Sequence, residues 1–328
     1  MPTPPAPMHA VLIRRFGGPD VVELAQMPMP APRPGELLLK VEAASLNPVD
    51  WKIRSGKYPL VGDDKLPYVL GRDFSATVLH SDSADLPSGT LVHGLLGIER
   101  GSFAQYVAAR PDELARVPGA LDRLAAAAVP LAGLTAWQGL FDHGGLQAGQ
   151  RVLIHAGAGG VGHFAVQFAK ARGAHVITTV SADDVAFARG LGADEVIDYQ
   201  AERFERRLRD IDLVYDLIGA DTQERSWSVL RKGGVLVSTV QEPSQEKAAA
   251  IGVRATRYTA ASDAGQLREI DALIQSGRVR VQVARRFAYG DAKAALQALE
   301  QGHASGKLVL DMAGVIESRP DPVYRPGD

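Results

Sequence analysis

The stretch RVLIHAGAGGVGHFAVQFAK, Arg151–Lys170, decides the fold of this chain. An apolar run, VLIH, leads directly into Gly157, Gly159 and Gly162, which have the spacing G-x-G-x-x-G, and an amphipathic segment with helical period follows. Glycine lets the backbone turn tightly and approach a pyrophosphate, and free N–H groups at a helix start attract the anion. The alternative is a glycine turn that only packs a strand against a helix. The strand–turn–helix context favours dinucleotide binding.

The residues after this loop alternate between apolar strands and amphipathic helices. Strands are expected at residues 151–156, 175–180, 194–199, 211–219, 234–240 and 252–258. Near-continuous apolar strands separated by helices are what a parallel sheet covered on both faces requires. The sequence therefore predicts an α/β domain with a doubly wound parallel sheet of the Rossmann type.

The residues before the loop show a different pattern, with short β runs broken by Pro and Gly. These runs are AVLIRRF (10–16), ELLLKVEAA (36–44), SATVLH (75–80), TLVHGLL (90–96) and FAQYVAA (103–109). An Ala-rich segment of helical period, residues 121–141, ends this part. We expect a tail at 1–7, a β-rich domain at 8–123, the cofactor domain at 124–262, and at 263–328 a return to the first domain followed by a polar, proline-broken tail.

The composition is that of an ordinary soluble globular protein, with 46% apolar and 23% charged residues among 328. A net charge of −2 gives no electrostatic reason to expect nucleic acid or an anionic membrane as a partner. No apolar run approaches the roughly 18 residues that span a bilayer. The opening MPTPPAP lacks the features of a secretory signal, so a cytoplasmic location is expected. With no cysteine, disulfides and thiolate metal sites are excluded.

Several segments together resemble the medium-chain dehydrogenases/reductases, in particular their zinc-free quinone oxidoreductase (zeta-crystallin-like) branch. They are QRVLIHAGAGGVGHFAVQFAK, VPLAGLTAWQGL, NPVDWKIRSG and SGKLVL, and the resemblance runs from Met8 to about Met312. It implies a GroES-like catalytic domain followed by a Rossmann domain. It also implies a homodimer in which the nucleotide-binding sheets meet edge to edge, with contacts around residues 254–259.

The resemblance explains an absence in the first domain. The family's zinc alcohol dehydrogenases bind their catalytic metal through a Cys-x-x-Asp segment, a Gly-His-Glu segment and a later cysteine. Here the matching places read Asn47-Pro-Val-Asp50 and Gly71-Arg72-Asp73. An amide and a guanidinium are not zinc ligands, so we expect no metal site.

A reaction without a metal needs an acceptor that is already polarised. A hydride can add to the β-carbon of an enone or to a quinone, because conjugation places electron demand there. The developing enolate then needs hydrogen-bond donors and a proton. The resemblance implies this reaction: reduction of quinones or activated C=C bonds with NADPH.

Four residues of the NPVDWKIRSG region are candidates for the substrate site. Asn47 is expected to donate its amide N–H to the substrate oxygen; the alternative is a turn residue before Pro48. The resemblance gives Tyr58 a place in the substrate cleft, as a proton or hydrogen-bond donor, against a role in packing only. Trp51 would form an apolar wall for a flat substrate. Lys52 is also expected to contact the substrate. Some relatives have a tyrosine at this position, so the sequence departs here from the family pattern.

The predicted cofactor contacts lie along both domains and rest mainly on the resemblance. They are Asn47, Thr135, Gly157, Gly159, Gly160, Val161, Gly162, Ser181, Tyr199, Leu217, Ile218, Thr239, Val240 and Lys307. For Tyr199 the alternative is an exposed aromatic at a strand end, and for Lys307 a solvated lysine.

The choice between NADPH and NADH depends on the end of the second strand. NAD enzymes often place an acidic residue there to bind the ribose hydroxyls, whereas this strand ends on Ser181. Ser181 favours NADPH, but Asp183 and Asp184 follow and would repel a 2′-phosphate if they faced it. The alternative is that both carboxylates only complement a helix N-terminus.

Two other functions stay open at this point. An enoyl-thioester reductase would share the fold and the hydride chemistry. A non-catalytic NADPH-binding or RNA-binding protein of the zeta-crystallin type would belong to another class, although the acidic balance and the absence of basic stretches argue against nucleic acid.

Overall fold

The computed structural model describes residues 7–302 and 304–313, which form two compact units. One unit contains the chain up to Leu131, from Ser262 to Gln275, and from Val281 onward. The other runs from Ala132 to Ala261 and includes Ser276–Arg280. The change of unit thus comes a few residues after the expected boundary at 123, and Pro7, expected in the N-terminal tail, already opens a strand. The rest of that tail and residues 314–328 lie outside the described residues.

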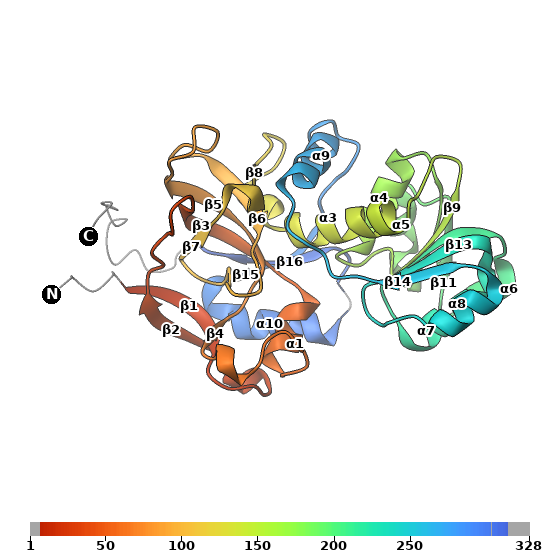
Figure 1. The fold of residues 1–328 in the computed structure, drawn as a ribbon, viewed down its shortest axis with the longest axis horizontal. Helices are drawn as coiled ribbons and strands as arrows, with labels where there is room; N and C mark the ends of the chain where they lie inside the picture. The colour runs from red at the N-terminus through yellow and green to blue at the C-terminus, as the bar shows by residue number, and fades with distance from the viewer. Residues whose placement is uncertain (1–6, 303, 314–328) are drawn as a thin grey trace. The chain divides into compact units, whose positions relative to one another are not determined.

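The first unit is built from two antiparallel-rich sheets with four helices packed on them (Figure 1). A three-stranded sheet has the order β2-β1-β4, and a seven-stranded sheet has the order β15-β16-β3-β5-β6-β8, with β7 also paired to β3. The strands are β1 Pro7–Ile13, β2 Glu23–Pro28, β3 Leu37–Leu46, β4 Tyr68–Val69, β5 Asp73–His80, β6 Leu91–Leu95, β7 Tyr106–Ala109, β8 Leu114–Arg116, β15 Val283–Ala288 and β16 Lys307–Asp311. The helices are α1 Pro48–Arg54, α2 Arg123–Ala127, α9 Ala264–Gln275 and α10 Ala292–Gln301.

Strand β3 organises this unit because three strands pair with it. Its first half lies between β5 and β7, and its second half lies between β5 and β16, antiparallel to each. A strand in that position is buried on both faces, which explains its near-continuous apolar sequence LLLKVEAASL. Because β16 comes from the end of the described chain, this pairing places that end of the chain in the first unit.

The sequence reasoning missed strands β2, β4 and β8 and helix α1 of this unit, and one expected helix is broken. Strand β2 alternates half-buried and exposed residues without strong β-formers, so its signal is weak. Helix α1 begins with Pro48 at its first turn and has a capping box between Asn47 and Asp50. The helical segment expected at 121–141 divides before α3, because Pro130 cannot continue a helix but suits the start of the next.

The second unit is a six-stranded sheet in which every neighbouring pair is parallel, in the order β11-β10-β9-β12-β13-β14. Numbered along the unit, this is the 3-2-1-4-5-6 order of the Rossmann fold, which confirms the predicted fold class. The strands are β9 Arg151–His155, β10 His175–Val180, β11 Glu195–Asp198, β12 Ile211–Asp216, β13 Leu230–Ser238 and β14 Arg254–Arg257. The helices are α3 Pro130–Trp137, which begins at the unit boundary, with a π-helical turn Gln138–His143 behind it, α4 Gly162–Ala171, α5 Val185–Gly190, α6 Phe204–Arg207, α7 Ala220–Ser226 and α8 Gln245–Ile251.

The order of the strands places the glycine loop at the switch point of the sheet. The loop follows β9, whose neighbours β10 and β12 lie on opposite sides of it and belong to the two halves of the fold. Ligands of open α/β sheets bind outside the carboxyl ends of the strands at such a point. The edge strand β14 contains the segment for which the resemblance implied contact with a second copy. Within the described residues, no helix has the length and apolarity that crossing a membrane would need.

A buried histidine, His155, closes strand β9 and is held by two hydroxyl groups. Ser226 Oγ donates to the carbonyl of Thr222, so it accepts from His155 Nε2 at 3.0 Å; Nδ1 then accepts from Thr179 Oγ1, also at 3.0 Å. Burial lowers the pKa of this imidazole to about 4; the charge of Asp216 opposes the shift and that of Arg225 adds to it. His155 is therefore neutral in the folded protein at pH 7.

We predict that His155 makes the protein less stable in acid. Between pH 6.5 and about 4 the unfolded chain binds a proton that the folded chain does not, so the free energy of unfolding falls as the pH falls. The raised pKa of the buried Asp50 carboxyl, about 7, acts in the opposite direction in every variant, so the effect of His155 is the difference between two proteins. From pH 7 to pH 5, urea unfolding should show that the unmodified protein loses about 2 kcal/mol relative to H155Q. The control H9Q should change with pH as the unmodified protein does; an H155Q protein that changes with pH in the same way would contradict the prediction.

Candidate active site

The three motif glycines of the loop after β9 are required for different reasons. A Cβ on Gly157 would lie 2.0 Å from Thr178 Oγ1, and one on Gly162 would lie 2.0 Å from the Ala156 carbonyl oxygen. These two positions are closed by the protein itself. A Cβ on Gly159 would meet nothing closer than Ala156 O at 3.4 Å, and Gly159 does not have a positive φ. Neither packing nor backbone conformation requires glycine at 159, which leaves close approach by a ligand such as a pyrophosphate as its reason.

The other cofactor candidates of this unit follow the carboxyl ends of strands, as the sheet order requires. Ser181 follows β10, Tyr199 follows β11, Leu217 and Ile218 follow β12, and Thr239 and Val240 follow β13, while Gly160 and Val161 belong to the glycine loop. Tyr199, Ile218 and Val240 are exposed apolar or aromatic side chains, and Tyr199 has the largest exposed fraction, 55%. Exposed side chains at the binding edge of such a sheet suit contacts with a flat ligand.

Thr135, which lies in α3 and not at a strand end, is buried among tyrosines. Its carbonyl oxygen accepts hydrogen bonds from Tyr215 Oη at 2.9 Å and from Tyr258 Oη. Burial raises the pKa of both phenols, so both stay protonated and can donate. The contact predicted between Thr135 and the nicotinamide ribose stays a prediction; these bonds fix the backbone from which the side chain extends.

The side chains after β10 answer the question of which way the acidic residues point. Ser181 Oγ donates to Asp184 Oδ2 at 2.8 Å, so one carboxylate is turned toward the end of β10. Asp183 is exposed. The pair of short helices that begins here thus has a negative charge next to the position at which NAD and NADP differ.

In the first unit, the predicted residues Asn47 and Lys307 meet in a buried polar cluster. Asn47 Nδ2 donates to Asp73 Oδ1 at 2.7 Å, and Ser45 Oγ donates to the same oxygen at 2.7 Å. The other oxygen of Asp73 accepts from the backbone N–H of Leu131 at 3.0 Å. Lys307 Nζ donates to Asn47 Oδ1 and to the Leu46 carbonyl at 3.1 Å. The amide of Asn47 is therefore oriented by a cation on one side and a carboxylate on the other.

This cluster changes the environment expected for two residues. Lys307, for which a solvated lysine was the alternative, is only 3% exposed, and burial lowers the pKa of its amine while Asp73 and Asp50 oppose the shift. Asn47 is 4% exposed, and its N–H groups already have acceptors in Asp73 and in the Ser45 carbonyl at 3.3 Å. A hydrogen bond from Asn47 to a substrate, which stays a prediction, would have to replace one of these.

Asp50 anchors the start of α1 from the centre of the same region. Its Oδ2 accepts from the Asn47 N–H at 2.7 Å and its Oδ1 from the Gly71 N–H at 3.2 Å. Burial raises the pKa of this carboxyl to about 7; the Asn47 N–H opposes the shift, Asp73 adds to it, and Arg72 and Lys307 oppose it. The Asp50 carboxyl therefore titrates near neutral pH, unlike a carboxylate in a loop that is exposed to solvent.

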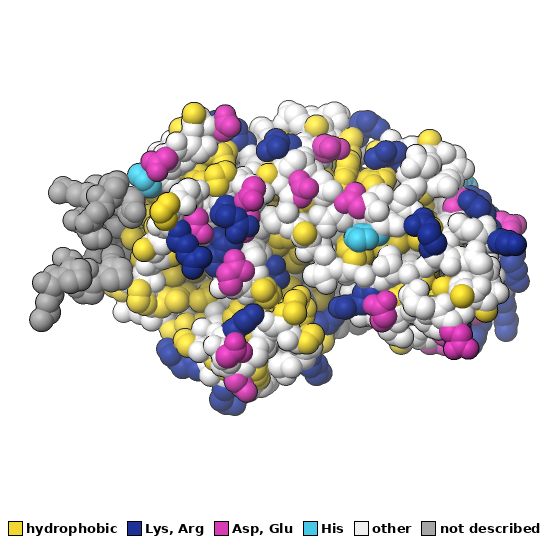
Figure 2. Space-filling model, viewed as in Figure 1, with side chains coloured by type: hydrophobic (Ala, Val, Ile, Leu, Met, Phe, Trp, Pro, Cys, Tyr) yellow, Lys and Arg dark blue, Asp and Glu magenta, His cyan; other side chains and the backbone are white. Residues whose placement is uncertain are grey.

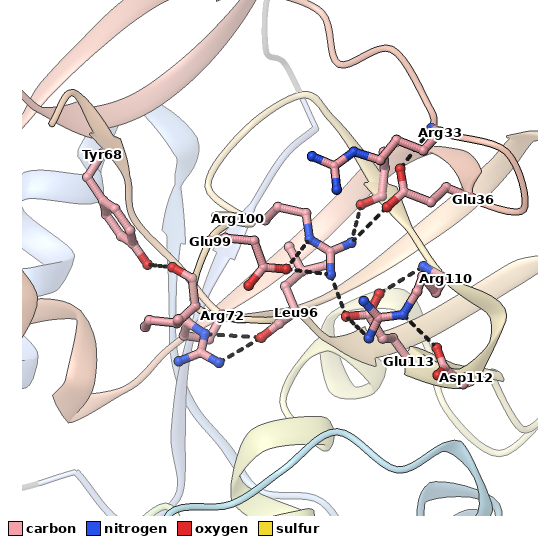
Figure 3. Close-up of polar contacts among 12 residues, drawn as sticks. Arg33, Glu36, Tyr68, Arg72, Leu96, Glu99, Arg100, Arg110, Asp112 and Glu113 are labelled. Atoms are coloured by element: carbon pink, nitrogen blue, oxygen red, sulfur yellow. Dashed lines mark hydrogen bonds and ion pairs between the residues drawn. The ribbon is translucent and has the colours of Figure 1, made fainter. Parts of the chain in front are cut away.

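Asp50, Arg72 and Asp73 do not form a metal site with Asn47. Asp73 already accepts from three donors, and the Arg72 guanidinium donates Nε and Nη2 to the Leu96 carbonyl at 3.2 and 2.7 Å (Figure 3). An amide that donates to a carboxylate and a guanidinium are not a zinc donor set. In the described part of the chain, no group of three or more His, Asp or Glu is arranged to hold a metal ion. Metal independence of the activity stays a prediction.

The substrate candidates Trp51, Lys52 and Tyr58 come from α1 and the turn behind it. All three are partly buried, and the ammonium groups of Lys52 and Lys57 lie 5.9 and 5.7 Å from the centre of the Trp51 ring. Tyr58 packs against the core of the unit, and its phenol oxygen has no hydrogen-bond partner among residues 7–302 and 304–313.

The sequence reasoning did not select Ser45, Arg72 or Asp73 as site residues. The signal was available, since GRD follows NPVD at the spacing of the family's second ligand segment.

The chain belongs to the medium-chain dehydrogenase/reductase superfamily, in its quinone oxidoreductase branch. The family described as alcohol dehydrogenase GroES-like domain matches residues 33–119, and the family described as zinc-binding dehydrogenase matches residues 191–310. These matches agree with a GroES-like first unit and a cofactor-binding second unit. The protein is therefore an oxidoreductase of this superfamily.

Among its relatives is the chloroplastic NADPH-dependent alkenal/one oxidoreductase of Arabidopsis thaliana, 34% identical over 93% of this chain and 80% of that protein. Similar solved structures include the quinone oxidoreductase from Coxiella burnetii, with 37% identity, a TM-score of 0.86, and coverage of 93% of this chain and 99% of that one. The Escherichia coli quinone oxidoreductase complexed with NADPH is 29% identical, with a TM-score of 0.84 and coverage of 92% and 99%.

We predict that alanine at two glycines of the loop has opposite consequences. G162A should lower stability by about 1–3 kcal/mol, because its Cβ collides with the Ala156 carbonyl. G159A should keep its stability within about 1 kcal/mol and lose about tenfold or more in NADPH affinity, because its Cβ enters space left for the ligand. Thermal unfolding and calorimetric titration with NADPH separate the two effects. A G159A protein that binds NADPH like the unmodified one would contradict the assignment of the loop.

Proposed function

We propose that this protein is a metal-independent reductase that transfers a hydride from NADPH to a quinone or to an α,β-unsaturated carbonyl compound. The observation that carries the proposal is the Asn47–Asp73–Lys307 cluster. In this cluster, hydrogen-bonding side chains occupy the segments that supply the metal ligands in the zinc-dependent relatives. The other unit has a glycine loop with room for a phosphate group. The quinone and alkenal/one activities of its relatives support the same acceptor class.

The residues of the second unit fit a nicotinamide dinucleotide. The backbone around Gly159, Gly160 and Val161 would hold the pyrophosphate at the start of α4, where the helix dipole favours an anion. Ile218 and Val240 would cover the rings at the ends of β12 and β13. When bound, the reduced nicotinamide supplies a hydride.

The first unit would supply the groups that handle the acceptor. A carbonyl oxygen that gains negative charge needs donors held in place before the reaction, since reorganising them would cost free energy. The hydrogen bonds of Lys307 and Asp73 to Asn47 hold the amide of Asn47 in one orientation before the reaction. The phenol of Tyr58, which has no partner among the described residues, is free to donate a proton to the reduced acceptor or to relay one from water.

Two alternatives remain within reach of the same fold. An enoyl-thioester reductase would use the same groups on a larger acyl chain, and its test is the inclusion of thioester substrates. A non-catalytic RNA-binding role has less support, because RNA affinity depends on a field of positive charge. On the face drawn in Figure 2, basic and acidic side chains of the described residues are interspersed.

The proposal is tested with an acceptor panel. Oxidation of NADPH, followed as loss of absorbance at the nicotinamide band, should be fast with quinones, enones or enals and slow with enoyl thioesters and simple ketones. Activity should persist after chelator treatment and dialysis. Turnover of enoyl thioesters alone would establish the alternative, and stoichiometric zinc whose removal abolishes activity would overturn the metal-independent reaction.

We further predict that the cofactor preference depends on Asp184. Its carboxylate accepts from Ser181 Oγ and repels a 2′-phosphate, an effect of roughly 1–2 kcal/mol when partly screened. D184N should therefore raise the ratio of kcat/KM for NADPH to that for NADH about tenfold, and S181D should lower it by a similar factor. D221N, which removes an exposed carboxylate of α7, is the control. If D184N leaves the ratio unchanged, the 2′-phosphate does not lie at the end of β10.

A further inference from the structure

Arg72 is a nearly buried cation without a counter-ion. Its exposed fraction is 9%, and within the described part of the chain the guanidinium donates hydrogen bonds only to a neutral group, the carbonyl of Leu96. No carboxylate of the described residues lies within ion-pair distance of it. Burying a charge is costly unless it is paired and hydrogen-bonded, so an unpaired guanidinium in such a place points to a partner that arrives from outside.

The same unit pairs its neighbouring arginines with carboxylates. Figure 3 shows Arg100 bound to Glu113 and Glu99, and Arg110 bound to Asp112 and Glu113. The absence of a partner for Arg72 is thus a local feature and does not reflect a shortage of acidic side chains. Asp50 acts on Arg72 from beyond ion-pair distance, but it is bonded to two backbone N–H groups and titrates near neutral pH.

The guanidinium of Arg72 is fixed and still has hydrogen-bonding capacity. Leu96 accepts from Nε and Nη2, and the Leu96 N–H donates to the Arg72 carbonyl at 2.8 Å, so the two residues are joined by main chain and side chain. Of the five N–H groups of a guanidinium, three remain, two of them on Nη1. In Figure 3 this terminal nitrogen points away from Leu96, and it is not among the enclosed atoms that lack a partner.

Arg72 and the candidate proton donor, Tyr58, both act electrostatically on the phenol of Tyr68. The Tyr68 phenol, which donates to the Ile98 carbonyl at 2.8 Å, is under the electrostatic influence of Arg72, Asp50 and Tyr58 together. Tyr58 and Tyr68 pack in the same core cluster. A fixed cationic donor and a phenol without a partner in the described structure thus belong to one neighbourhood.

We infer that Arg72 Nη1 donates a hydrogen bond to the carbonyl oxygen of the acceptor and stabilises the negative charge that this oxygen gains; this assignment rests on the proposed function. The acceptor takes up a hydride at its β-carbon, the C=C electron pair shifts, and the carbonyl becomes an enolate as the nicotinamide is oxidised. A proton from Tyr58 or water then forms the second bond, at the α-carbon. Arg72 gives up no proton, because a guanidinium stays protonated throughout.

The test compares R72Q with the control R116Q. Arg116 likewise donates Nε and Nη2 to one backbone carbonyl, that of Asp85, but is exposed. For the best quinone or enone of the panel, R72Q should lose about 100-fold in kcat/KM, as expected when a donor to a developing oxyanion is removed, and most of this loss should fall on kcat. R116Q should stay within about twofold of the unmodified protein.

A second readout uses 4-nitrophenol, whose anion has a conjugated ring oxygen like an enolate and a visible absorption that the neutral form lacks. The unmodified protein and R116Q should bind the anion, seen as an absorption increase near neutral pH, and R72Q should lose this signal while the melting temperature changes little. If R72Q does not fold, R72K serves instead: it keeps the charge but not the fixed fork, so it should fold and still lose activity and anion binding.

The outcomes separate the assignment from the function on which it rests. An unmodified protein that reduces no acceptor of the panel removes both. An active protein whose R72Q variant, or whose R72K variant if R72Q fails to fold, retains kcat/KM and binds the 4-nitrophenol anion overturns the role of Arg72 alone.

Discussion

The hydrogen bonds of Lys307 hold together residues that lie about as far apart in the sequence as the described chain allows. Its ammonium donates to Asn47 Oδ1 and to the Leu46 carbonyl, while β16, which begins with Lys307, pairs with β3. A lysine survives such burial because two carboxyl groups, those of Asp50 and Asp73, lie close by. This contact orients the Asn47 amide, at the point where the pairing of β16 with β3 begins.

The buried cluster is ordered by hydrogen bonds between its side chains. Asp73 accepts from Ser45, Asn47 and the Leu131 N–H, so its negative charge is distributed over three donors. The positive charge in the region comes from Lys307, which is enclosed, and from Arg72, which is fixed at the boundary. An organic cation differs from a metal because it donates hydrogen bonds in set directions, which suits a carbonyl oxygen better than an alcohol to be deprotonated.

In the glycine loop of the second unit, some glycines are required by contacts within the protein and another by the ligand. Gly157 and Gly162 are required by close contacts with Thr178 and Ala156, so a side chain at either position would lower the stability of the fold. Gly159 has room around it. The Ser181–Asp184 bond at the next strand end is a local contact, because Ser181 directly precedes the short helix Ala182–Asp184 and Asp184 lies three residues further on.

The sequence by itself determined the doubly wound domain, because strand–glycine–helix order and apolar periodicity are local properties that the parallel sheet preserves. It also determined which residue types occupy the positions of the metal ligands. Only the tertiary structure decided what Asn47, Arg72 and Lys307 do there, since each has a partner that lies between 24 and 261 residues away along the chain. Burial and hydrogen-bond partners of that kind are set by strand pairing, which no local pattern records; Lys307 in particular looks like a surface lysine until β16 is placed against β3.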